Sequence, residues 1–187
     1  MATVNLHPDA TILIGSNWDI IGGGTLHSSL ADSDDATLIR NDTQNETVIF
    51  LLDDLHASLS GVTITSVRFY VRGVLYNTRS GNTDIQVILT DASDTTYYAE
   101  TVTLNFTGGY APEDHYGTAR TTSDGSTSWT VSDIDGLRLN INTSPEDPPG
   151  PSYAQFVKAY VEVTYTVPSA DDAIFLEQIF KNGRICI

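Results

Sequence analysis

Apolar and polar residues alternate along much of the chain, most clearly near its end. From Val157 to Val167 apolar side chains occupy every second position, with polar residues or tyrosine between them. Successive side chains of a β-strand point to opposite faces of the sheet, so this segment predicts one long strand with a buried face and a solvent face. Such a strand is typical of an antiparallel β-sandwich.

Shorter segments of the same kind recur at fairly even spacing, separated by residues that favour turns. Regular spacing of short strands favours a sandwich over a parallel α/β sheet. We therefore predict an all-β fold, an antiparallel jelly-roll-like β-sandwich that forms one domain over residues 1–167, with a hairpin loop at 77–83. The other predicted strands cover residues 10–14, 18–21, 36–40, 46–52, 62–76, 85–89, 97–106, 129–131 and 137–141.

The composition changes after Pro168, where a short helix is predicted. Ser169 and Asp172 have the spacing of a helix N-terminal cap, and Asn182-Gly183 would end the helix. Residues 168–187 either close one end of their own sandwich or form an arm that buries its apolar side chains in a neighbouring subunit. The candidate contact residues of this arm are Ile174, Phe175, Leu176, Ile179, Phe180, Ile185 and Ile187.

The net charge of the 187 residues is −15, from 24 acidic and 9 basic residues. A surface this negative repels phosphate groups, so we expect no direct binding to nucleic acid or to an anionic membrane. No segment approaches the roughly 20 apolar residues of a membrane span, and the first residues do not resemble a signal peptide. We therefore expect synthesis in a cytoplasm without secretion by the ordinary route.

The sequence lacks the groupings of residues that catalysis or tight metal binding requires. The four histidines lie far apart, and neither a Gly-x-Ser-x-Gly motif nor a phosphate-binding loop is present. We therefore predict no enzymatic activity and no required cofactor, and a glycan hydrolase is the least favoured alternative. Calcium remains an alternative ligand, because Asp32–Asp35 and Asp91–Asp94 place oxygen donors close together in loops.

The longest irregular segment predicted is 107–128. Loops of this length are usually functional or disordered, which makes the segment a candidate contact surface. Tyr110 and Tyr116 lie within it, where an exposed ring would stack on a sugar or pack on another protein. Trp129 follows directly and is predicted to begin a strand and to lie in the core.

Five stretches together resemble the jelly-roll structural proteins of tailed bacteriophages, especially the trimeric decoration (cement) proteins of capsids. They are Ser33–Arg40, Gly61–Arg72, Ser128–Thr130, Ile134–Ile141 and Ala159–Tyr165. The resemblance implies a non-enzymatic virion protein, synthesised in the host cytoplasm, that binds the outer capsid surface between capsomers and stabilises the shell. It implies a homotrimer whose partner is the major capsid protein or another virion protein, and it supplies no catalytic residue.

One alternative role belongs to the same class of structural proteins. A sandwich associated with a tail, baseplate or fibre would bind other virion proteins or host surface glycans, and Tyr110 and Tyr116 would then be candidate sugar contacts.

Overall fold

The structure is a computed structural model that describes residues 1–15, 17–31, 36–41, 46–55, 61–77, 82–105, 111–143 and 152–168. Most of the described residues lie in strands, and two short helices accompany them. In chain order the elements are β1 (Ala2–Leu6), β2 (Pro8–Ile14), β3 (Trp18–Ile21), α1 (Leu26–Ala31), β4 (Leu38–Asn41), β5 (Thr47–Leu52), β6 (Thr63–Asn77), β7 (Asn82–Thr90), β8 (Thr96–Asn105), β9 (Glu113–Tyr116), α2 (Val131–Asp135), β10 (Arg138–Thr143) and β11 (Ser152–Thr166).

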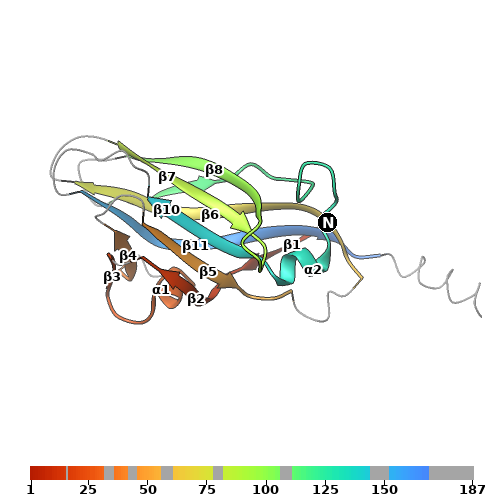
Figure 1. Cartoon of the computed structure of the whole chain (residues 1–187), viewed down its shortest axis with the longest axis horizontal. Helices are drawn as coiled ribbons and strands as arrows, with labels where there is room; N and C mark the ends of the chain where they lie inside the picture. Colours follow the sequence, from red (N-terminus) through yellow and green to blue (C-terminus); the bar gives the residue numbers. More distant parts are fainter. Residues whose placement is uncertain are drawn as a thin grey trace, which may run out of the picture.

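The strands form two sheets that run along the long axis of the molecule and pack face to face (Figure 1). The first sheet has the order β3-β4-β11-β6-β9, with β1 also paired to β11, and the second has the order β2-β5-β10-β7-β8. Every strand pair is antiparallel. The predicted antiparallel, jelly-roll-like β-sandwich is confirmed. Of the predicted C-terminal helix or arm, residues 169–187 lie outside the described part of the chain.

The core lies between the inner faces of the two sheets. Phe50 comes from β5 in the second sheet, whereas Phe69 and Phe156 come from β6 and β11 in the first, and all three are fully buried. Burying a side chain of this size contributes roughly 1.5–3 kcal/mol. The pairing of β6 with β11 extends from Ser152 opposite Asn77 to Thr166 opposite Thr63, so these two strands form the backbone of the first sheet.

The alternation predicted from Val157 to Val167 is confirmed from Val157 to Val163 and fails at the end of the strand. Ala159, Val161 and Val163 are buried as expected. A register shift against β6 lies between Phe156 and Lys158, and both Phe156 and Val157 are buried. A β-bulge adds one residue to a strand and so interrupts the alternation of faces. Val167 was expected on the buried face but is exposed, because β11 ends at Thr166.

The hairpin predicted at residues 77–83 is wrong. β6 belongs to the first sheet and β7 to the second, so the chain crosses from one layer to the other between Asn77 and Asn82. β6 pairs with β11 and β9, and β7 pairs with β10 and β8. Pairing between distant segments therefore determines the neighbours of these two strands, although the intervening residues are typical of a turn.

One side of the sandwich, between β8 and β9, is covered by the residues that follow β9. The Gly117 N–H donates to the Phe69 carbonyl at 3.0 Å, and Arg120 and Val67 exchange two backbone hydrogen bonds of 2.8 and 2.9 Å. The Trp129 Nε1–H donates to the Arg120 carbonyl at 3.0 Å. These bonds connect residues 117–129, which we call the covering segment, to the free edge of β6 next to β9.

Two predictions for this part of the chain need correction. Residues 113–116 were expected in an irregular segment, but they form β9 because they pair with Tyr70–Gly73 of β6. Residues 129–131 were expected to form a strand, but Val131 begins α2. Thr130 caps this helix, exchanging hydrogen bonds with Asp133 in a capping box. Trp129 is buried in the core, as predicted.

Candidate functional site

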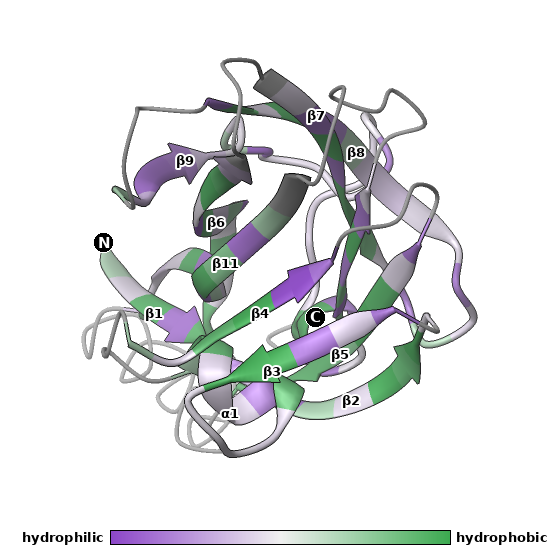
Figure 2. Ribbon diagram, turned by 90° about the vertical axis from the view of Figure 1, so that its left-hand side faces the viewer, coloured by the Kyte–Doolittle hydropathy of each residue, from purple (hydrophilic) through white to green (hydrophobic). Residues whose placement is uncertain are grey.

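On the side of the sandwich opposite the covering segment, the edges of the two sheets are left open. β2 is an edge strand of the second sheet, and β3 is an edge strand of the first. Figure 2, which views the sandwich end-on, shows these two edges near each other with α1 beside them. Helix α1 packs against β2, β4 and β11, and its Leu26 and Leu30 are buried. A hollow remains between the two strands and the helix.

This hollow, which we call the β2–β3 groove, has a volume of about 510 Å³. Its lining is mostly apolar, with a few polar groups contributed by threonine and histidine side chains. The lining residues are Ala10, Thr11, Ile14, Trp18, Ile20, Gly24, Thr25, Leu26 and His27. Concave apolar surfaces with a small number of polar groups are the usual form of binding sites.

Trp18 contributes the largest side chain of the groove. The indole is 8 % exposed, and its ring centroid lies 6.2 Å from that of Phe156 in the core. Its Nε1–H is buried and has no hydrogen-bond acceptor among the residues that the structure describes. A buried donor without an acceptor costs free energy, but this N–H is itself shielded from solvent, so the indole contributes its apolar ring to the groove.

The rim of the groove carries a strip of exposed apolar side chains. They are 37 to 54 % exposed, and they are Ile12, Leu13, Ile14, Ile20 and Ile21. Contiguous exposed apolar side chains of this kind mark contact sites between proteins. We call these five residues the apolar rim.

The apolar rim has a structural cause in β2. The pairing of β2 with β5 shifts register between Pro8 and Ala10 and again between Thr11 and Leu13. These irregularities interrupt the alternation of faces, so the consecutive residues Ile12, Leu13 and Ile14 are all exposed. In the described residues β2 has one neighbouring strand, β5, and β3 has one, β4, so each presents an unpaired backbone edge.

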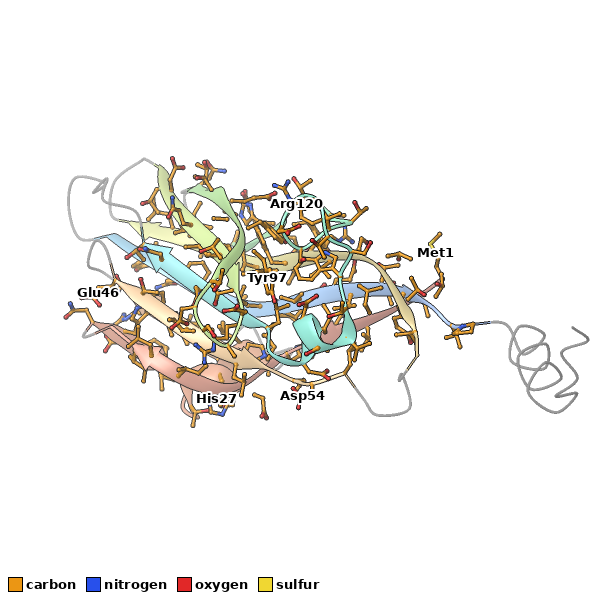
Figure 3. All side chains as sticks on the ribbon, turned by 45° about the vertical axis from the view of Figure 1, so that its right-hand side comes forward. Met1, His27, Glu46, Asp54, Tyr97 and Arg120 are labelled. Carbon is orange, nitrogen blue, oxygen red and sulfur yellow. The ribbon has the colours of Figure 1, made fainter. Side chains whose placement is uncertain are left out.

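The polar corner of the groove is built by α1 and the residues before it. His27 Nδ1 lies 3.2 Å from the Thr11 hydroxyl, and its Nε2 lies 3.0 Å from the Thr25 hydroxyl. The Thr25 N–H donates to the Ser28 hydroxyl at 2.9 Å, which fixes the start of the helix. Gly22, Gly23 and Gly24 before it all have positive φ, from 93° to 95°, which lets the chain turn from β3 into α1. Figure 3 shows His27 and Arg120 on opposite sides of the molecule.

A second surface lies on the outer face of the first sheet, where three tyrosines meet. Tyr70 on β6 stacks on Tyr160 on β11 at 4.4 Å between centroids, and Tyr116 on β9 lies 4.9 Å from Tyr70. The Arg68 guanidinium lies over the Tyr116 ring at 4.7 Å. Tyr116 is 52 % exposed, whereas Tyr70 is buried. We call this cluster the tyrosine face.

Charged groups on the tyrosine face are paired with one another. Arg72 lies 2.7 Å from Asp114, and the Tyr70 hydroxyl donates to the same carboxylate at 2.8 Å. These two hydrogen bonds hold the pKa of Asp114 below its usual value. Burial raises the pKa of Tyr160 to about 12, so its hydroxyl is protonated at neutral pH. The charged groups of the tyrosine face therefore neutralise one another, and Tyr116 is the exposed ring of the cluster.

The structure brings few of the predicted site residues together. Tyr116 lies on β9 and is exposed, in agreement with a contact role, although it belongs to a strand rather than to a loop. The other predicted contact residues lie outside the described residues. They are Tyr110, Ile174, Phe175, Leu176, Ile179, Phe180, Ile185 and Ile187.

The predicted calcium loops are placed in part. At one of them, Asp91 Oδ1 accepts hydrogen bonds from the N–H groups of Ser93 and Thr95 at 2.7 and 2.8 Å, and Asp94 pairs with Arg138 at 2.6 Å. These carboxylates already have partners, Asp91 within its own turn and Asp94 in Arg138 on β10. Asp32–Asp35 lies outside the described residues. Among the residues that are described, no group of three or more His, Cys, Asp or Glu side chains is placed to hold a metal ion.

The sequence interpretation missed the groove and its rim. Residues 10–14 and 18–21 were recognised as strands, but nothing in their composition indicated that both are edge strands. The one available signal was the unbroken apolar run of Ile12, Leu13 and Ile14, which does not alternate as a strand with one buried face should.

In the described part of the chain no helix is long and apolar enough to cross a membrane.

Comparison with known proteins gives the following. No family model and no curated protein matches the chain. Solved structures that match include an arabinose-bound MgGH51 α-L-arabinofuranosidase, at 7 % identity and a TM-score of 0.48 over 85 % of this chain and 26 % of that one. They also include a truncated AlyQ with CBM32 and alginate lyase domains, at 12 % identity and a TM-score of 0.48 over 89 % of this chain and 34 % of that one. The chain spans about a quarter and a third of these two, and neither match carries an argument about function.

Proposed function

We propose that this protein is a non-enzymatic structural component of a tailed-bacteriophage virion, a decoration protein that binds the outer capsid surface between capsomers and stabilises the shell. The single observation that carries the proposal is the apolar rim beside two unpaired strand edges. An exposed apolar strip on an open edge favours association with other chains, because a partner removes both the apolar surface and the free backbone groups from water.

The size of the surface indicates what kind of association it supports. Full burial of one Ile or Leu contributes roughly 1.5–3 kcal/mol, and the five rim residues are already about half buried, so together they supply roughly 4–7 kcal/mol. Association costs an estimated 4–15 kcal/mol in lost freedom of motion. One rim is therefore a weak contact by itself. A symmetric assembly on a shell repeats the contact, and the linked contacts reinforce one another.

The charge of the chain supports a position on the outside of a shell. The net charge of −15 repels packaged DNA and keeps unassembled copies in solution. Binding to the assembled shell alone would stabilise that state by mass action.

Labelling of intact particles tests the proposal. Gold-coupled antibodies against the chain should mark the whole outer shell, and Ile14→Asp/Ile20→Asp chains should be absent from the particles. Tyr116→Ala serves as the matched control, because its side chain is exposed to a similar extent but lies on the tyrosine face. Particles without label, or equal incorporation of the rim variant, would contradict the proposal.

The second candidate function is a tail, baseplate or fibre-associated module that binds host surface glycans through the tyrosine face. The half-exposed Tyr116 ring beside Arg72 and Asp114 supports it, since an aromatic ring next to charged hydrogen-bonding groups suits a sugar. Label confined to the tail, together with binding on a glycan array that Tyr116→Ala removes, would favour this function over decoration.

A further inference from the structure

The β2–β3 groove and the end of the chain have complementary surfaces. The groove is lined mostly by apolar side chains, among them Ile14, Trp18 and Ile20. Residues 169–187 contain five large apolar side chains within seven positions, from Ile174 to Phe180. An apolar segment presented to an apolar groove removes both surfaces from water.

The position of β11 limits how this segment reaches a groove. Phe156 pairs with Ile39 of β4, and Ile39 pairs with Ile20 of β3, so the groove lies level with the start of β11. From Phe156 to Thr166 the strand runs about 33 Å away from that level. In Figure 1 this end of β11 lies far from β3 and α1. The five apolar side chains begin at Ile174, six residues beyond Pro168, which is at most about 22 Å even in a fully extended chain, so the run as a whole is too short to return to the groove of its own chain.

Charge also favours a contact between the segment of one copy and the groove of another. Two chains with a net charge of −15 repel each other, and the segment itself has three carboxylates, Asp171, Asp172 and Glu177, yet its last seven residues carry Lys181 and Arg184 and no acidic side chain. Carboxylates stand beside the groove, with Asp9 on β2 and Glu46 hydrogen-bonded to the Asn17 side chain before β3. The basic end of the segment therefore meets acidic groups near the groove.

We propose that the β2–β3 groove binds residues 169–187 of a second copy of this chain. The inference deepens the proposed function, since it names the partner of the apolar rim. Each copy then offers one groove and one segment, so the contact is head-to-tail and joins different surfaces on the two copies. A head-to-tail contact closes into a ring when the rotation between copies allows it, and three copies in a ring give the trimer that was predicted.

Sedimentation velocity on full-length chains tests this arrangement with two variants. Ile14→Asp/Ile20→Asp damages the groove, and Phe175→Asp/Phe180→Asp damages the segment. Each should dissociate to monomer, with a dissociation constant at least about tenfold above that of the unchanged chain. Tyr116→Asp, on the tyrosine face, should sediment like the unchanged chain.

Mixing the two variants gives the decisive result. The groove variant still has an intact segment and the segment variant an intact groove, so an equimolar mixture should form a one-to-one pair that neither forms alone. In a Trp129→Phe background Trp18 is the only tryptophan, and its emission should move to shorter wavelength on mixing. Pair formation also shows that both variants are folded.

The outcomes separate this inference from the proposed function. A monomeric unchanged chain, a mixture that forms no pair, or a segment variant that remains assembled would each overturn the inference. In the last case, if the rim variant is still absent from particles, the proposed function stands with a different partner in the groove. A one-to-one pair from a chain that no particle contains would support the inference and refute the proposed function.

Discussion

The two sides of the sandwich, where the edges of the sheets meet, differ in how completely the chain covers them. Between β8 and β9 the chain covers its own edges with the segment from Gly117 to Trp129, which bonds to the backbone of β6. Between β2 and β3 the chain adds a single six-residue helix, α1, and leaves a groove with an apolar rim. The same fold thus contains a side that is complete and a side that is ready for a partner.

The covered side is stabilised by rings as well as by hydrogen bonds. Trp129 meets Tyr97 edge to face at 5.0 Å, and Tyr98 stacks with Phe69 at 6.2 Å and accepts a hydrogen bond from the Phe69 N–H at 3.2 Å. Arg120 lies over the Tyr98 ring and pairs with Glu100 at 3.3 Å. Figure 3 shows Arg120 on this side of the molecule. Substitutions here should reduce folding stability, whereas substitutions on the apolar rim should reduce association.

The largest difference is expected between Trp129→Ala and Ile14→Ala. Trp129 is buried and donates a hydrogen bond, so its loss should lower the free energy of unfolding by about 3–5 kcal/mol. Ile14 is 54 % exposed, and its truncation should change the free energy of unfolding of the monomer by less than about 0.5 kcal/mol. Urea unfolding at low protein concentration measures both values. Similar losses from the two variants would show that the two sides do not differ.

A smaller loss of folding stability is expected from Gly117→Ala, at the point where the covering segment passes Phe69. A Cβ atom at this position would lie 2.5 Å from the Phe69 ring, so the variant overpacks the covered side by about 1–3 kcal/mol. Gly136→Ala is the matched control, because a Cβ atom there has no neighbour closer than 3.8 Å. Thermal unfolding should show a lower Tm for the first variant than for the second. An equal Tm would mean that Phe69 moves aside without cost.

Removal of the helix cap should cost about 1 kcal/mol. Thr130→Ala deletes the hydroxyl that accepts from the Asp133 N–H at 3.2 Å, at the point where the covering segment enters α2. Ser132→Ala in the exposed first turn keeps the cap and serves as the control. Chemical unfolding should separate the two variants. No difference between them would show that Trp129 alone anchors this end of the segment.

The smallest expected effect is on the pH dependence of folding stability. It involves His7, between β1 and β2, and His115 on β9. Burial lowers the pKa of His7 against the opposing charge of Asp53, and it also lowers the pKa of His115. A depressed pKa in the folded state means that the neutral ring is favoured by folding. Its contribution is present above the unfolded value of 6.5 and is lost as the pH falls through the folded pKa.

NMR titration of the ring protons should place both midpoints below 6.5. Stability measured from pH 7 to 5 should decline less steeply in a His7→Gln/His115→Gln variant than in the unchanged chain. His27→Gln, in the groove, is the comparison variant. A midpoint above 6.5 for either of these half-buried rings would contradict the expectation.

The sequence predicted those parts of the fold that local patterning controls. The alternation from Val157 to Val167 indicated the central strand and its buried face. Trp129 was correctly predicted to lie in the core, although the strand that it was expected to begin is the helix α2 with its cap. The bulge at Phe156 was not visible, because both residues around it are apolar and either face would suit them.

Long-range pairing determined what the sequence did not reveal. Residues 77–83 are typical of a turn, yet β6 and β7 lie in different sheets because their partners come from distant segments. Glu113–Tyr116 has little tendency to form a strand and becomes β9 through its pairing with β6. The groove escaped prediction for the same reason, since edge positions follow from the order of strands and not from the strands themselves.

The central position of β11 has a mechanical consequence. The strand is held along one side by β6 over its whole length and along the other by β4 and β1. A load applied beyond Pro168 acts along the strand axis, so the ladder bonds on both flanks are sheared together and do not open one at a time. A neighbouring chain that binds residues beyond Pro168 therefore loads a strand that is hydrogen-bonded along both of its edges.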